Sequence, residues 1–316
     1  MNFSGLIHDF GPLTITGLTQ GAIIALFALG YTLVYGVLRL INFAHSEVFM
    51  LGSYACLVLW GWLGLDQNSA TPGLAAVIGL LLVGLVASIL VSGATALAVE
   101  FVAYRPLRRR NAPPLAFLIT AIGASLAISE LVGVQTDRNV RGVPPLVRQA
   151  DVIVIGDTHI TNLQIAIIAL ALGSMYILDR FINRSRLGRG IRAVAQNPDS
   201  AALMGVNKGR VISLVFMIGG LMAGVAALMY DLKIGGTRFD AGFILGIEAF
   251  TAAVLGGIGN LRGALVGGLL LGVLQNWAAG LFGSAWLHAA SFVLLVLILL
   301  FRPTGLLGES LGKARA

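Results

Sequence analysis

Nine apolar stretches, each about as long as a membrane-spanning helix, occupy most of this sequence. A helix needs about 20 predominantly apolar residues to cross the hydrocarbon core of a bilayer. Polar breaks near 39–42 and 261–263 are so short that a re-entrant or broken helix is open at either place, so we predict about eight to ten transmembrane helices. The expected crossings are 14–38, 43–65, 73–99, 115–134, 160–178, 211–230, 243–260, 264–283 and 286–301.

The composition excludes a soluble enzyme. Of the 316 residues, 57% are hydrophobic and 11% are charged, which is too little polar surface to cover a water-soluble domain. The single Cys56 cannot form an internal disulfide or a thiolate metal cluster. The first 13 residues carry no Lys or Arg, and no A-x-A site follows the first apolar run, so we expect no cleaved signal peptide. The fold class is therefore an all-α polytopic membrane protein, read as a single transmembrane domain over 1–316.

The basic residues predict the orientation of the chain, because alternate loops between crossings fall on opposite sides of the membrane. Sixteen Lys and Arg residues fall on one side, chiefly in loops 100–114 and 179–210, and five fall on the other. Loops rich in Lys and Arg stay in the cytoplasm. We therefore expect the amino terminus outside and the carboxyl terminus in the cytoplasm. The net charge of +7 then records orientation and gives no reason to invoke nucleic acid.

Polar side chains within the predicted crossings are costly in the membrane and are candidates for a transport pathway. The competing interpretation is that neighbouring helices satisfy these side chains or that the side chains snorkel to the surface. It applies to Glu130, near the end of its crossing, and to Glu248, six residues into its own. His45 and Glu47 are two residues apart and point about 200° from one another on a helix, which argues against a catalytic or metal-binding pair. The pathway candidates are Gln20, Asn42, His45, Glu47, Glu248 and Asn260.

The sequence contains neither a metalloprotease nor a serine-hydrolase motif and no metal-ligand spacing. We therefore predict no catalytic residue and no metal site, and a membrane-embedded enzyme finds no support.

Glycines spaced four residues apart predict close helix packing, because each pair lies on one helix face and lets another backbone approach. The run 256–259 is more typical of a break. A broken helix within the membrane has to be buried or line a cavity, so 256–263 is a further pathway candidate. The pairs are Gly17 and Gly21, Gly220 and Gly224, Gly263 and Gly267, and Gly268 and Gly272.

The loop 179–210 contains a short helix with clear end signals. Asn197 is a strong N-cap, Pro198 suits the first helical position, Asp199 is favourable at the positive end of the helix dipole, and Gly205 can end the helix in a left-handed conformation. We expect about two turns, Asp199 to Gly205, with the apolar residues exposed unless a partner covers them. The favoured interpretation is docking of a soluble partner, and the alternative is a helix resting on the membrane surface. The exposed apolar residues are Ala201, Ala202, Leu203 and Met204.

A family resemblance rests on this helix and two other segments. The pattern A-x-x-N-P-x-x-A-x-x-x-G, the preceding run 187–193, the early segment 41–47 and the run 255–260 with Gly263 resemble the permease subunits of bacterial ABC importers. The likeness is nearest to the LivH type of branched-chain, or hydrophobic, amino acid importers. It extends over about 30–305. The Glu-Ala-Ala loop of many other importers is replaced by Asp199-Ser200-Ala201.

The resemblance implies an ABC importer permease fold in the bacterial inner membrane, with 179–210 as the coupling loop. It implies four partners: two ATP-binding cassette subunits, a homologous second permease and a periplasmic or lipid-anchored substrate-binding protein. No phosphate-binding loop occurs in the sequence, so we expect ATP and Mg²⁺ on the ATPase subunits and no cofactor in this chain. The alternative is a stand-alone channel or proton-coupled carrier that uses Glu47, Glu130 or Glu248. Relatives of this permease type serve amino acids, amides and urea, so the sequence does not fix the substrate.

Overall fold

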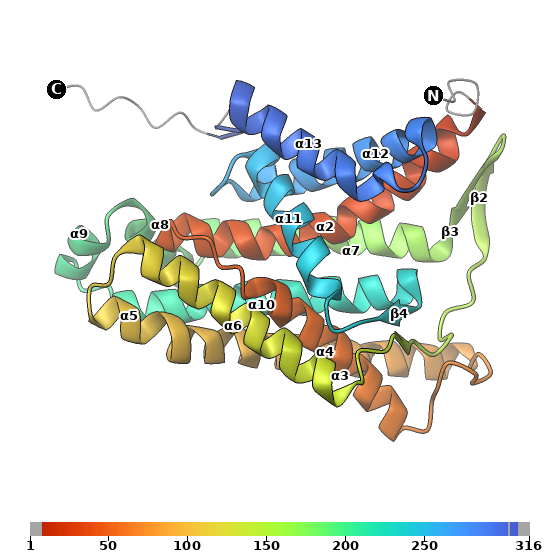
Figure 1. Ribbon diagram of the computed structural model, residues 1–316, viewed down its shortest axis with the longest axis horizontal. Helices are drawn as coiled ribbons and strands as arrows, with labels where there is room; N and C mark the ends of the chain where they lie inside the picture. Colours follow the sequence, from red (N-terminus) through yellow and green to blue (C-terminus); the bar gives the residue numbers. More distant parts are fainter. Residues whose placement is uncertain (1–7, 303, 309–316) are drawn as a thin grey trace.

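Nine long helices occupy the predicted crossings in the part of the chain that the computed structural model describes, residues 8–302 and 304–308. Most of them run alongside one another (Figure 1). The polytopic all-α fold expected from the apolar stretches is therefore confirmed. These helices are α2 (Phe10–Leu38), α3 (His45–Trp62), α4 (Leu74–Val99), α6 (Pro114–Gln135), α7 (Asn162–Arg184), α10 (Lys208–Ile234), α11 (Ala241–Gly256), α12 (Leu261–Phe282) and α13 (Trp286–Phe301).

Six of the nine are long and apolar enough to cross a membrane by themselves. By contrast, α11 and α13 have 16 residues each, or about 24 Å of helix, against a hydrocarbon core about 30 Å thick. Helix α11 is also steeply inclined to α7 and α10 (Figure 1). The ninth helix, α3, has 18 residues but is not apolar enough to be counted with the six. Length and apolar character together thus separate six full crossings from three other helices packed among them.

Helix α4 continues further than the sequence predicted. We expected a loop over 100–114, but a π-helical turn, η1 (Glu100–Tyr104), joins α4 to α5 (Arg105–Arg109). The charge at the turn is buried and paired: Arg108 donates to Glu100 Oε1 at 2.7 Å, and Ser213 Oγ donates to Glu100 Oε2 at 3.1 Å. These bonds satisfy the carboxylate of Glu100. The residue can therefore lie inside a helix, although the sequence analysis placed it in a loop.

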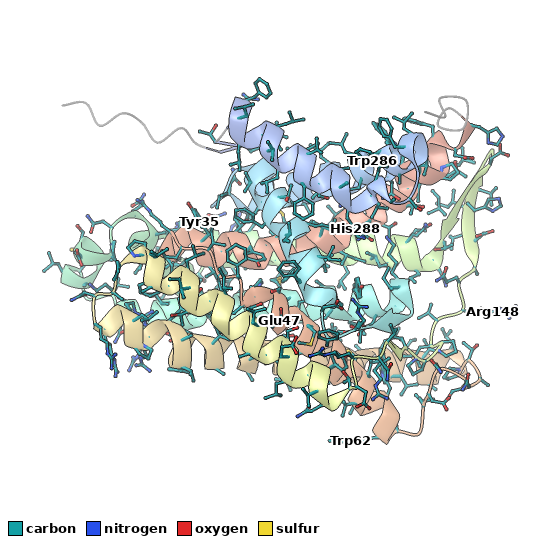
Figure 2. All side chains as sticks on the ribbon, in the orientation of Figure 1. Tyr35, Glu47, Trp62, Arg148, Trp286 and His288 are labelled. Atoms are coloured by element: carbon teal, nitrogen blue, oxygen red, sulfur yellow. The ribbon has the colours of Figure 1, made fainter. Side chains whose placement is uncertain are left out.

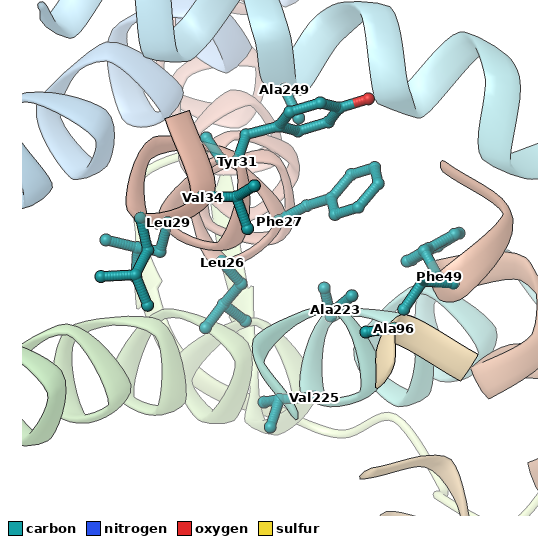
Figure 3. Close-up of a cluster of buried hydrophobic side chains, with 14 of the residues drawn as sticks. Leu26, Phe27, Leu29, Tyr31, Val34, Phe49, Ala96, Ala223, Val225 and Ala249 are labelled. Atoms are coloured by element: carbon teal, nitrogen blue, oxygen red, sulfur yellow. The ribbon is translucent and has the colours of Figure 1, made fainter. Parts of the chain in front are cut away.

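Helix α2 forms the centre of the bundle and packs against α12, α10, α7 and α11. Figure 3 shows its Leu26, Phe27 and Leu29 within the buried core. Glycine allows the close approach of α12: a Cβ on Gly21 would lie 2.5 Å from the carbonyl oxygen of Gly268, and one on Gly272 would lie 2.3 Å from that of Gly17. The predicted packing role of these glycines is confirmed.

Two small sheets, which the sequence did not predict, lie at one end of the bundle. Strands β2 (Asp151–Ile155) and β3 (Thr158–Thr161) form a hairpin, and β1 (Arg141–Gly142) pairs with β4 (Gly236–Thr237). The predicted crossing from 160 therefore begins inside β3, and α7 itself starts at Asn162. The hairpin lies beside the first turn of α2, and α8 (Arg186–Gln196) and α9 (Pro198–Leu203) lie at the opposite end (Figure 1). We call these the hairpin end and the α9 end.

The predicted break after α11 is confirmed. Gly257 and Gly259 have φ values of 105° and 95°, which glycine adopts without strain. The segment 304–308 packs into this break, since the amides of Leu306 and Leu307 donate to the carbonyls of Leu255 and Gly256 at 2.7 and 3.0 Å. Residues 304–308 thus cover the break.

Candidate functional site

The ends of α9 are built as the sequence predicts. The Asn197 side-chain oxygen accepts from the amides of Asp199 and Ser200, both at 3.0 Å, and satisfies two of the unpaired donors at the helix start. Pro198 is the first helical residue. Gly205 follows in a left-handed conformation with φ 84°. The Asp199 carboxylate accepts from Lys208 Nζ at 2.9 Å, which ties the helix start to α10.

Helix α9 is shorter and less uniformly exposed than predicted. It has six residues, Pro198–Leu203, in place of two turns from Asp199 to Gly205. The helix ends there because the backbone amides of Met204 and Gly205 donate to carbonyls of its last turn. Ala201 is buried at 4% exposure, which corrects the expectation that it is exposed. Ala202 faces solvent, and Leu203 and Met204 are 89% and 85% exposed. The exposed apolar face of α9 is therefore Ala202, Leu203 and Met204.

Helix α8, which the sequence did not predict, supports α9. Ser185 caps it by accepting from the Gly188 amide at 2.8 Å, and the side chain of Arg192 donates to the Ile182 carbonyl at 2.5 Å, which fixes α8 to the end of α7. Helix α9 packs on α8 and on α10. A force applied to α9 would therefore reach α7 through α8, and α10 directly.

Three pathway candidates, Asn42, His45 and Glu47, lie together at the start of α3 and are buried. The ring of His45 stacks on Phe27 of α2 at a centroid distance of 5.0 Å. Glu47 faces α6, where Ser125 Oγ donates to its Oε1 at 3.0 Å, and Figure 2 shows it near the middle of the bundle. His45 and Glu47 thus contact different helices, as their spacing predicts.

Glu248 of α11 belongs to a second buried polar cluster, which joins α11, α12 and α13. Gln275 Nε2 donates to its Oε1 at 2.8 Å, and His288 Nδ1 lies 2.7 Å from the same oxygen. Gln275 also bonds Ser291. Gln20, from the candidate set, lies elsewhere: it accepts from Lys233 Nζ at 2.7 Å and joins α2 to α10.

Two remaining candidates have other contacts. Asn260 accepts from the Gly263 amide at 3.1 Å, which caps α12, and donates to the Leu307 carbonyl at 2.8 Å. Its side chain therefore holds the break and the chain end together, apart from the other candidates. Glu130 is exposed and accepts from Arg138 at 2.5 Å, which fits the surface interpretation of this carboxylate.

Asp231, like Glu100, is a buried carboxylate that the sequence analysis placed outside a helix. Asp231 and Lys233 follow the predicted crossing 211–230, yet both lie in α10, which extends to Ile234. Asp231 is fully buried and accepts from Ser53 Oγ of α3 at 2.5 Å. Its partner is 178 positions away along the chain, so no local pattern reveals the pair.

One ion pair at the hairpin end joins neighbouring loop residues. The Arg238 side chain donates to Asp240 and lowers the pKa of that carboxyl below its usual range. This pair lies directly before the start of α11.

Comparison with known proteins identifies the family. The family model described as branched-chain amino acid transport system / permease component matches residues 13–301. The chain belongs to this permease family. The high-affinity branched-chain amino acid transport system permease protein BraD of Pseudomonas aeruginosa is 42% identical over 96% of this chain and 97% of its own length. LivH of Escherichia coli K12 is 39% identical over 93% and 94%.

One more distant relative carries the same description. A probable branched-chain amino acid transport permease protein LivH of Methanocaldococcus jannaschii is 26% identical over 98% of this chain and 97% of its own length. Among solved structures, PsaBC from Streptococcus pneumoniae in complex with Fab matches 95% of both chains at 13% identity and a TM-score of 0.46. The chain is thus a multi-pass membrane permease, as the resemblance implied.

Proposed function

We propose that this permease is a membrane subunit of an ATP-driven importer that carries branched-chain or related amino acids across the bacterial inner membrane. Two ATPase subunits, a homologous second permease and a periplasmic or lipid-anchored binding protein complete the assembly. The full-length match to the permease family, over 13–301, is the observation that carries this proposal. It favours the importer over a stand-alone carrier.

One ATPase subunit docks on the exposed apolar face of α9. Ala202, Leu203 and Met204 face solvent at one extremity of the molecule, where a soluble partner gains free energy by covering them. In this assembly the ATPase subunits bind ATP and Mg²⁺, and this chain binds neither. Docking also places the α9 end in the cytoplasm and the hairpin end, with the start of α2, outside, where the binding protein is received.

Transport then follows from movement of α9. ATP-driven closure of the ATPases displaces α9, and α8 and α10 transmit the displacement to the bundle. The pathway changes between outward and inward access as a shift between two packings, driven by ligands that bind the two states differently. Among the pathway candidates, the buried Asn42, His45, Glu47 and Glu248 stay on the proposed route, together with Gln20.

The test changes one exposed residue of α9. Ala202→Asp places a charge on the docking face without disturbing the core, so the subunit should still insert and assemble. Substrate-stimulated ATP hydrolysis by the reconstituted complex should fall by about tenfold or more, since a desolvated unpaired charge at an interface costs several kcal/mol. The matched control Ala202→Ser keeps the side chain small and neutral and should retain coupling. Equal stimulation in both variants would remove α9 from the mechanism.

A further inference from the structure

A crevice of about 910 Å³ lies near the hairpin end, between α3, α4 and α6. It exists because neighbouring helices pack on different partners: α6 packs against α3 and the π-helical turn, whereas α4 packs against α3 and α10. The crevice shares none of its lining with α9 or with the candidate pathway residues. It is therefore separate from the proposed docking helix and transport route.

The walls of this crevice are apolar. They include Leu57 and Val58 of α3, Ala87 and Val91 of α4, and Val132 of α6. Val58 is 49% exposed, and the adjoining face of α4 carries exposed Leu82, Val86 and Leu90, so the crevice is continuous with a surface that faces hydrocarbon in a membrane. An acyl chain is the occupant that such walls accept.

The mouth of the crevice is polar and carries both signs of charge. Arg141 and Asp66 line it, together with the amides of Gln67 and Asn68. Arg141 forms no salt bridge with any described residue. Asp66 accepts from the Asn68 amide and from Ser69 Oγ at its Oδ1, so Oδ2 remains for a further donor. A guanidinium and a carboxylate at one opening complement a headgroup with a phosphate and a primary ammonium.

The depth of the mouth fits a lipid headgroup. Trp62, at the end of α3, lines the crevice and is 83% exposed, and Figure 2 shows it at the edge of the molecule. Tryptophan is enriched at the level of the headgroups. The order from walls to mouth is thus apolar, then aromatic, then charged, which is the order of groups along a phospholipid.

We propose that this crevice binds a phospholipid with a phosphoethanolamine headgroup. Its phosphate lies on Arg141, its ammonium group on Asp66 and an acyl chain along α3 and α4. The bound lipid comes from the leaflet at the hairpin end, and its binding does not depend on the transported substrate. The competing occupant is a helix of another protein chain. Such a helix would leave Arg141 and Asp66 without the phosphate and ammonium partners of a lipid, and the experiment distinguishes the two occupants.

The experiment is native mass spectrometry of the full-length permease, in the complex with which it purifies. The sample is exposed to equal amounts of phosphatidylethanolamine and phosphatidylglycerol with the same acyl chains. The wild type should retain phosphatidylethanolamine in preference. Arg141→Gln should lower its retention about tenfold, the loss expected for a charge-assisted hydrogen bond. Val58→Trp should abolish retention by filling the crevice, and Asp66→Asn should abolish the preference between the two lipids.

Matched variants separate the crevice from the general lipid shell. Arg148→Gln removes a charge at the same end that does not line the crevice, and Leu82→Trp enlarges a lipid-facing residue outside it; both should bind as the wild type does. Each variant is first checked for wild-type thermal unfolding. If Arg141→Gln and Val58→Trp both retain as much phosphatidylethanolamine as the wild type, the proposal is overturned. A photo-crosslinker at Val91 that captures a polypeptide in place of lipid would overturn it too.

Discussion

Helices α2 and α13 are both apolar, but they are held in the protein by different interactions. In α2, 16 of 29 residues are buried, and glycines bring its backbone against that of α12. In α13, Ser291 is the one buried residue of 16, and polar contacts from Ser291 and His288 attach the helix to α12 and α11. Lipid tails are as apolar as leucine, so helices associate in a membrane through close packing and hydrogen bonds. The centre of this permease uses the first and its edge uses the second.

The largest effect is expected where backbones touch. Gly21→Ala puts a Cβ 2.5 Å from the carbonyl oxygen of Gly268, so α2 and α12 must separate. We expect a loss of about 4 kcal/mol or more in stability, seen as a large fall in the thermal unfolding temperature in detergent or in the yield of folded protein. The control Gly79→Ala lies on α4 with open space around it and should be neutral or slightly stabilising. Similar behaviour of the two variants would refute close packing at the centre.

A second pair of variants compares leucines of the two helices directly. Leu26 is fully buried in α2, and Leu297 is 45% exposed in α13. Leu26→Ala leaves a cavity and should cost about 2–4 kcal/mol, whereas Leu297→Ala exchanges protein–lipid contacts and should cost less than about 1 kcal/mol. Thermal unfolding of both variants measures the difference. Equal losses would show that α13 is packed as tightly as α2, for example against another subunit.

The smallest effect tests the polar attachment of α13. His288→Ala leaves the buried Glu248 with Gln275 as its partner, which should lower stability by about 1–2 kcal/mol. The control His159→Ala removes an exposed imidazole paired with Asp151 on the hairpin and should change stability by at most about 0.5 kcal/mol. If the two histidines prove equivalent, the contact between His288 and Glu248 contributes nothing to holding α13.

The long apolar stretches of the sequence were enough to place the nine helices, and the Asn197 and Pro198 signals were enough to place α9. Errors arose where a charge is satisfied far away along the chain. Glu100 and Asp231 read as loop residues, yet Ser213 and Ser53 satisfy them inside helices. The hairpin was missed because Val152 to Ile155 come shortly before an apolar run. Their partner strand, β3, ends inside the stretch that we predicted as the next crossing, from 160. Local sequence indicates which segments are apolar, but tertiary contacts decide where a helix ends.

The central claim is that this permease transports only as part of an ATP-driven assembly. Its most direct test is uptake of radiolabelled leucine into proteoliposomes, measured for the permease alone and for the complete complex with binding protein, with and without ATP at the ATPase side. We expect uptake only when every subunit and ATP are present, and we expect a pH gradient to leave it unchanged. Uptake by this chain alone, driven by a pH gradient and unaffected by ATP, would contradict the claim.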